Sequence, residues 1–347
     1  MQNQINRAFI NRDETVDIMK GFLILLMVAG HAQIPIHRFI YLFHMPVFFM
    51  ITGWLYNYER NDINIKDYTL RKVKSLYLPY IKYGVFFVLL SILCPFFFKE
   101  ACDGFSISET LNRLAGVFLF QGRFDINGPS WFVFALFFAT VIFNTLYKYL
   151  NIVLMWGAVL SIFIITYYFI NSLTIGLMGS ALLTVSMGYF IKIAIRNIGG
   201  FSYFVKLNIP LLVGSFLVLL IMLFITDNEV RMAANQLVNP GYFIIGSFIG
   251  FIFVYQTAKL ISRTPVSSIL IYLGRHSLVI LFLHLLAFKL ISYIQILVYH
   301  LDISLLSKHP VACVEDHWWI LYMLSGILLP LLFEKIMGKF RFSNNSI

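Results

Sequence analysis

The sequence predicts an all-α fold, a polytopic membrane bundle of about ten transmembrane helices with both termini in the cytoplasm. Of its 347 residues, 60% are hydrophobic and only 12% are charged, whereas soluble domains carry roughly 25% charged residues. Apolar runs of about 20 residues, enough to cross about 30 Å of hydrocarbon as a helix, recur along the whole chain. Lysine and arginine also gather in alternate loops, which is the pattern that the positive-inside rule describes.

The apolar runs and the polar breaks between them define the expected spans in order. These lie near residues 16–35, 37–56, 76–98, 129–148, 152–171, 174–194, 207–226, 241–260, 276–298 and 317–337. No repeat or low-complexity linker divides them, so we expect residues 1–347 to form a single transmembrane domain. Between the third and fourth spans, Ser106 or Ser108 is expected to cap a short amphipathic helix on the membrane surface.

The distribution of charge gives the orientation. With the N-terminus inside, most lysines and arginines fall in the inner loops and the two tails. This bias accounts for the formal net charge of +10 without a nucleic-acid partner. The N-terminal segment lacks the pattern of a cleavable signal peptide, so we expect the first span to be retained. The sequence therefore predicts a multi-pass protein of the plasma (inner) membrane.

The first span, "DIMKGFLILLMVAGH", contains three ionisable residues, Asp17, Lys20 and His31. A charged group in a span costs a few kcal/mol or more unless it faces protein or water, which makes each a functional candidate. Lys20 and His31 are eleven residues apart, so they project from one helical face about 16 Å apart. Asp17 shares that face, although Asp17 and Lys20 can also simply reach the inner interface. An imidazole can take a proton from a hydroxyl group, so His31 suits acyl transfer to an alcohol.

The second span adds another histidine, in "FHMPVFFMITGWLY". Pro46 removes a backbone hydrogen bond, so we expect it to kink the helix or to free a carbonyl beside His44. His44 is either a packing residue at this kink or a second catalytic residue. Histidines on two adjacent helices are a stronger functional signal than either alone.

These two spans resemble the start of the membrane acyltransferase 3 family, especially its branch of fucose 4-O-acetylase-like proteins. The family signature is a basic residue, ten residues and then a histidine, which matches Lys20 and His31. Later family motifs follow in order along nearly the whole chain, in "RKVKSLYLPYI", "GPSWFVFALF", "NPGYFIIGSFIG" and "LGRHSLVILFLHLLAF". One segment, "DNEVRMAANQLVNPG", is less regular than expected of fucose-acetylase relatives and leaves the acceptor open.

The resemblance implies transfer of an acyl group, usually acetyl from cytoplasmic acetyl-CoA, to a sugar hydroxyl of a cell-surface glycan or glycolipid. His31 is then the general base. Lys20 and the cations of the third-span entry are expected to attract the phosphates of coenzyme A, although the same cations could bind anionic lipid. These entry cations are Arg71, Lys72 and Lys74.

Other residues are expected to support this chemistry. Trp131 can stack on a sugar ring or on adenine, or it can belong to an interfacial aromatic belt. Asp17 lies about 21 Å from His31 along the helix and cannot orient its ring. Candidates to orient His31 are therefore His44, Asn239 and His284.

A transporter or flippase for a lipid-linked glycan is the alternative from another class. Intramembrane histidines and basic inner loops suit it, but the chain lacks an inverted repeat with paired broken spans.

The three cysteines, Cys94, Cys102 and Cys313, have no CxxC spacing, so we expect no metal site. Cys102 and Cys313 both fall in predicted outer loops, where they could form a disulfide.

Overall fold

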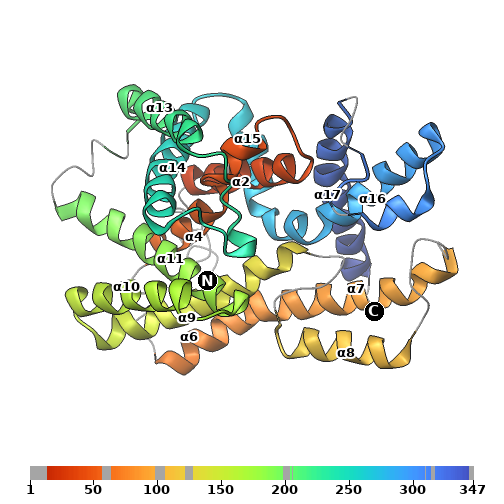
Figure 1. The fold of residues 1–347 in the computed structure, drawn as a ribbon, viewed down its shortest axis with the longest axis horizontal. Coiled ribbons are helices and arrows are strands. Elements are labelled where there is room, and N and C mark those ends of the chain that lie inside the picture. The colour runs from red at the N-terminus through yellow and green to blue at the C-terminus, as the bar shows by residue number, and fades with distance from the viewer. Residues whose placement is uncertain are drawn as a thin grey trace.

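Helices make up the fold of this chain (Figure 1). The computed structural model describes residues 14–56, 64–97, 106–121, 128–197, 204, 206–308, 310–313 and 317–343. Within these ranges, the regular secondary structure is helical apart from one isolated β-bridge between Arg231 and Gln236. In the described part of the chain, six helices are long and apolar enough to cross a membrane, and further shorter apolar helices accompany them. The predicted polytopic all-α bundle is confirmed.

Most predicted spans coincide with one helix. These helices are α2 (Glu14–His31), α7 (Leu78–Phe97), α9 (Trp131–Tyr149), α10 (Ile152–Tyr168), α11 (Leu173–Asn197), α13 (Ile209–Ile225), α14 (Pro240–Ile261), α16 (Ser277–Tyr299) and α17 (Trp319–Ser343). Asparagine caps begin three of them, because Asn151, Asn208 and Asn239 each accept a backbone N–H from the first turn.

The second predicted span is not one helix. It is divided into α3 (His37–Tyr41) and α4 (His44–Trp54), and the 11 residues of α4 rise only about 16 Å, roughly half the hydrocarbon thickness. The chain breaks just before Pro46 instead of bending within one helix, and Pro46 lies in the first turn of α4, where its missing N–H costs no intrahelical bond. At the break, His44 Nδ1 donates to the Ile40 carbonyl at 2.9 Å.

The basic segment that was predicted to be an inner loop is helical. Helix α6 (Ile65–Lys72) continues through a π-helical turn, η1 (Val73–Tyr77), directly into α7. Arg71, Lys72 and Lys74 therefore lie on a helix, and both α6 and η1 pack against α9. In the last of the predicted inner loops, α15 (Val266–Arg275) packs along α2.

Helix α2 lies inside the bundle and contacts α4, α14, α15, α16 and α17. Its approach to α15 requires glycine on both helices. A Cβ at Gly21 would lie 1.9 Å from the Leu270 carbonyl oxygen, and one at Gly274 would lie 2.0 Å from the Asp17 carbonyl oxygen. This close packing holds the helix that carries Asp17, Lys20 and His31 in a fixed place.

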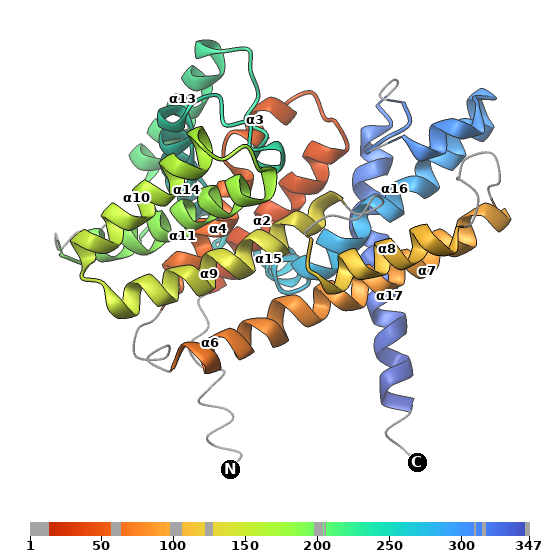
Figure 2. The ribbon, with the colours of Figure 1, turned by 60° about the horizontal axis from the view of Figure 1, so that its bottom comes forward.

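A short helix, α8 (Ile107–Phe118), follows the third span as expected. Ser106 is its N-cap and accepts a hydrogen bond from the backbone N–H of Glu109 at 3.4 Å. The helix lies alongside α7 (Figures 1 and 2), and the Tyr77 hydroxyl donates to the Phe118 carbonyl at 2.7 Å. The Ser106 alternative for the cap is confirmed.

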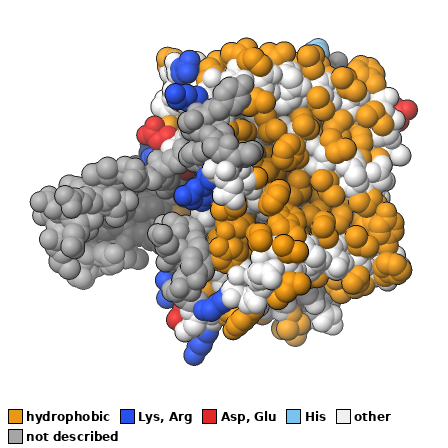
Figure 3. Space-filling view, turned by 90° about the vertical axis from the view of Figure 1, so that its left-hand side faces the viewer, with side chains coloured by type: hydrophobic (Ala, Val, Ile, Leu, Met, Phe, Trp, Pro, Cys, Tyr) orange, Lys and Arg blue, Asp and Glu red, His pale blue; other side chains and the backbone are white. Residues whose placement is uncertain are grey.

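The outer surface of the bundle suits a lipid environment. Large apolar side chains of α10 and α13 are exposed, among them Val153, Ile164, Leu217 and Phe224. Figure 3 shows the side of the molecule on the left of Figure 1 as a broad apolar surface, with lysine and arginine side chains gathered along one border. Such an apolar belt with a basic border is typical of a multi-pass membrane protein.

Candidate functional site

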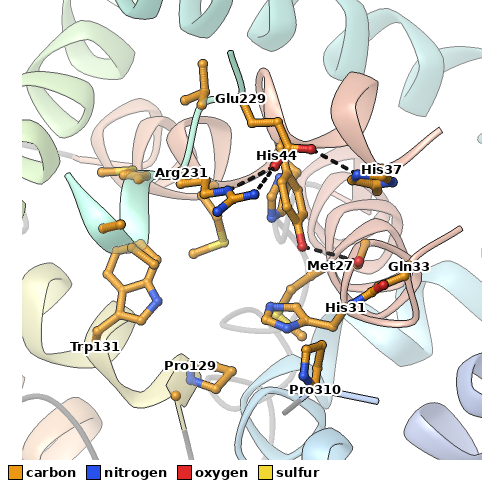
Figure 4. Close-up of a pocket in the computed structure, with 18 of the residues that line it drawn as sticks. Met27, His31, Gln33, His37, His44, Pro129, Trp131, Glu229, Arg231 and Pro310 are labelled. Carbon is orange, nitrogen blue, oxygen red and sulfur yellow. Dashed lines mark hydrogen bonds and ion pairs between the residues drawn. The ribbon is translucent and has the colours of Figure 1, made fainter. Parts of the chain in front are cut away.

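A cavity of about 670 Å³ lies at the C-terminal end of α2, beside the break between α3 and α4 (Figure 4). Its wall combines apolar side chains with histidine, tyrosine and arginine. The lining residues are Met27, Gly30, His31, Gln33, His37, Tyr41, His44, Met45, Gly128, Pro129, Trp131, Glu229, Val230, Arg231, Met232, Ala233, Ala234, Leu281 and Pro310. Apolar walls with a few convergent polar groups are typical of a small-molecule site.

His31 is the last residue of α2 and is partly exposed to this cavity. The fully buried ring of His284, on α16, packs edge-on against it with ring centroids 5.1 Å apart. Nδ1 of His284 lies 3.0 Å from both the Ile280 and Leu281 carbonyl oxygens. Because carbonyl oxygens only accept, Nδ1 carries a hydrogen. Of the three predicted partners, His284 contacts the His31 ring.

His44 begins α4 and is only 5% exposed. Its ring stacks on that of Tyr41, with centroids 5.2 Å apart and planes 27° apart. The Tyr41 hydroxyl in turn donates to the Gly30 carbonyl at 3.2 Å. Tyr41 therefore connects the second histidine to the residue that precedes His31, a role that the sequence did not reveal.

Trp131 is the first residue of α9 and follows the short 3-10 helix η2 (Gly128–Ser130). It lies across the cavity from His31 (Figure 4), and its side chain is largely buried. Asn239, by contrast, caps α14 by accepting the Tyr242 N–H at 2.8 Å and is not among the described lining residues. The structure thus brings together His31, His44 and Trp131 with His284 behind them.

Several residues that line the cavity were not predicted from the sequence as site residues. Nε2 of His37 lies 2.9 Å from Glu229 Oε1, and Arg231 donates through Nε to Glu229 Oε2 at 2.9 Å. Gln33, two residues after His31, has a left-handed backbone with φ of 59°. The irregular "DNEVRMAANQLVNPG" segment was the available signal, because Glu229 and Arg231 belong to it.

The basic candidates lie at the opposite end of α2. Lys20 and Lys72 are close enough for their charges to repel each other, and Lys72 is half-buried. Arg71 and Lys74 are exposed. Asp17 is buried, with its side chain 2% exposed, and forms an ion pair with Arg275 at 3.1 Å. Asp17 is therefore held within the protein by this ion pair.

The remaining candidates concern metal and disulfide chemistry. In the parts of the chain that the structure describes, no three His, Cys, Asp or Glu side chains gather in a metal-binding group. Cys313 has a free thiol. Cys102, its predicted partner, lies outside the described residues.

Comparison with known proteins gives a family for this chain. Residues 13–339 match the acyltransferase 3 family, described as an acyltransferase domain. The nodulation protein NolL of Sinorhizobium fredii is 45% identical over 58 residues, which cover 13% of this chain and 16% of that protein. NolL of Mesorhizobium japonicum is 27% identical over 152 residues, which cover 39% of this chain and 36% of that protein. These similarities span well under two thirds of either relative, and no solved structure matches.

Proposed function

This chain belongs to the acyltransferase 3 family of membrane acyltransferases, and on that premise we propose that it transfers an acetyl group from acetyl-CoA to a sugar hydroxyl. The acceptor is a cell-envelope glycan or glycolipid, and the enzyme lies in the inner membrane. The observation that carries the proposal is the exposure of His31 to a sugar-sized cavity, on the same helix as Lys20.

His31 acts as the general base in this proposal. It takes the proton of the acceptor hydroxyl while the oxygen attacks the thioester carbonyl carbon. The carbon–sulfur bond then breaks, the acetyl ester forms, and the proton on His31 passes to the departing thiolate. A base must lie within hydrogen-bond reach of the hydroxyl, and the position of His31 on the cavity wall allows this contact.

His284 is a positioning residue for His31. Its Nδ1–H is fixed on two backbone carbonyls, so its ring cannot turn freely and is held beside the His31 ring. A buried neighbour of this kind sets the orientation of a catalytic imidazole. Trp131 supplies an aromatic face on the opposite side of the cavity, where a sugar ring can stack.

Lys20 and Lys72 form the donor end. Lys20 on α2 and Lys72 on α6 are near enough for their charges to interact, and two neighbouring cations favour a phosphate-bearing ligand. Lys20 lies about 16 Å from His31 along α2. A donor whose phosphates bind at Lys20 and Lys72 would extend its thioester toward His31 through the bundle.

The proposal is tested with purified full-length protein, radiolabelled acetyl-CoA and a panel of glycan acceptors. We expect His31→Asn to lower transfer by about 100-fold or more, the usual contribution of a general base. His300→Asn is the matched control, because His300 is exposed beyond the end of α16 and does not line the cavity. Transfer that is unchanged in His31→Asn would refute the assigned base. A protein that consumes no acetyl-CoA yet moves glycolipid across vesicles would be a flippase.

A second variant tests the positioning role of His284. We expect His284→Gln to lower kcat, to leave the KM for acetyl-CoA unchanged and to move the acidic limb of the pH–rate profile. A purely structural role would lower the amount of folded enzyme without moving that limb. An unmoved limb would therefore contradict the assignment.

A further inference from the structure

The segment between α13 and α14 forms one wall of the cavity. Six consecutive lining residues, Glu229 to Ala234, come from it, including the short 3-10 helix η3 (Met232–Ala234). Arg38 Nη2 donates to the Thr226 carbonyl at 3.0 Å. The Arg231 backbone exchanges two hydrogen bonds with Gln236, at 2.7 and 3.1 Å. The backbone that carries the Arg231 side chain is therefore fixed.

The Arg231 side chain is oriented by one carboxylate. Nε and Nη2 both lie 2.9 Å from Oε2 of Glu229, whose side chain is 14% exposed, whereas that of Arg231 is 60% exposed. Among the residues that the structure describes, Nη1 of Arg231 has no hydrogen-bond partner. One edge of the planar guanidinium is thus held by protein, and the hydrogens on the terminal edge remain for a ligand. That edge matches a carboxylate or a phosphate.

A second side chain holds the same carboxylate. His37 Nδ1 lies 3.0 Å from the Ile34 carbonyl oxygen, and its Nε2 lies 2.9 Å from Glu229 Oε1. Glu229 is the single carboxylate among the described lining residues, and protein groups contact both of its oxygens: His37 contacts Oε1 and Arg231 contacts Oε2. The carboxylate that orients the guanidinium is therefore itself fixed.

The cavity places this cation opposite the catalytic candidate. In Figure 4, Arg231 and His31 lie on different sides of the open space, and Trp131 forms a third side. A sugar ring that stacks on Trp131 can present a hydroxyl to His31 and a substituent to Arg231. The volume of about 670 Å³ accommodates a sugar with such a substituent.

We propose that Arg231 forms a subsite for an anionic group on the acyl acceptor, either a carboxylate on the sugar or a phosphate attached to it. This inference rests on the proposed function and specifies its acceptor. Glu229 and His37 position the guanidinium, and Arg231 determines specificity. Neutral glycosides lack the group that this subsite binds.

The test compares three acceptors with the same sugar stereochemistry: a neutral methyl glycoside, the corresponding methyl uronate and the sugar 1-phosphate. We expect wild-type kcat/KM to favour an anionic acceptor over the neutral one by about tenfold or more, the size of one charge-assisted contact. Arg231→Gln should abolish this preference, mainly through the KM. Arg231→Lys should restore only part of it, because lysine keeps the charge but not the two-pronged contact.

Arg113→Gln is the matched control, because Arg113 also pairs with a glutamate, Glu109, but lies on α8 away from the cavity. Its preference should equal that of wild type, and thermal unfolding confirms that each variant is folded. The acceptor with the larger Arg231-dependent preference identifies carboxylate or phosphate as the source of the anion.

Different results would refute the proposed acetyl transfer and the proposed Arg231 subsite. Transfer that depends on His31 but shows no anionic preference, or a preference that survives Arg231→Gln, overturns the subsite and leaves the proposed function standing. Absence of transfer to every acceptor refutes the proposed function. The subsite is then judged by calorimetry with the uronate and the phosphate. Binding that Arg231→Gln weakens supports the subsite, and equal binding overturns it.

Discussion

Gly30, directly before His31, has too little room for a side chain. A Cβ added there would lie 2.6 Å from Cε1 of Tyr41 and 3.4 Å from its Cδ1. Carbon atoms pack favourably at roughly 3.5 Å or more, so the tyrosine ring must retreat by about 1 Å. The Tyr41 hydroxyl donates to the Gly30 carbonyl, and the Tyr41 ring stacks on that of His44. The substitution Gly30→Ala therefore displaces two groups of the cavity wall at once.

We expect Gly30→Ala to lower the free energy of unfolding by about 1–3 kcal/mol, as overpacking usually does. Transfer should fall much further, by about 100-fold, because a displacement of about 1 Å at a reacting centre has this effect. The assays are acetyl transfer and thermal unfolding on the same preparations. Gly214→Ala on α13 is the matched control, since a Cβ at Gly214 meets nothing within 4 Å.

The two alanine variants should behave differently in both assays. Gly214→Ala should keep wild-type transfer and gain up to about 1 kcal/mol of stability, because alanine is the better helix former. If Gly30→Ala transferred acetyl at the wild-type rate, the tight contact between Gly30 and Tyr41 would not control the site. The reasoning from the 2.6 Å distance would then be wrong.

Two further predictions concern the supports of the site. Arg275→Ala removes an ion-pair partner of a carboxylate that is 2% exposed and should lower the unfolding free energy by about 1–3 kcal/mol. Asp17→Asn should cost less, because the half-exposed guanidinium remains solvated. The reverse order in thermal unfolding would contradict this prediction. Tyr322→Phe removes hydrogen bonds to Ser292 and Gln295 and should cost about 1–3 kcal/mol. The same hydroxyl accepts the backbone N–H of residue 312, so the KM for the acceptor should rise as the cavity wall at residue 310 loosens; an unchanged KM would argue against this tether.

Local sequence signals predicted the long spans because each signal lies within the span itself. Helix α14, for example, combines an asparagine cap at Asn239, a proline at its first position and 22 helical residues. The break in the second span has a weaker signal. Pro46 marked this region but not the end of α3 at Tyr41, which depends on how the last carbonyls of α3 are satisfied. His44 contributes there by donating to the Ile40 carbonyl.

In the site, too, local features could be predicted from the sequence and long-range contacts could not. The spacing of Lys20 and His31 placed both on one helical face, and they lie on the single helix α2. Spacing could not rank the partners of His31, because His284 approaches from a helix about 250 residues later in the chain. The contact between His37 and Glu229 joins residues 192 positions apart. Such contacts depend on the packing of the whole bundle.

The π-helical turn between α6 and α7 has a consequence for insertions and deletions. A π turn contains one residue more than an α-helical turn. Each residue turns an α-helix by about 100°, so the side chains of α6 point about 100° away from where they would point if α6 and α7 were one unbroken α-helix. Deleting one residue within Val73–Tyr77 would leave α6 and α7 as one continuous α-helix and would turn Lys72 away from Lys20. The length of this turn therefore sets the direction in which Lys72 points relative to Lys20, and single substitutions within the turn do not change that length.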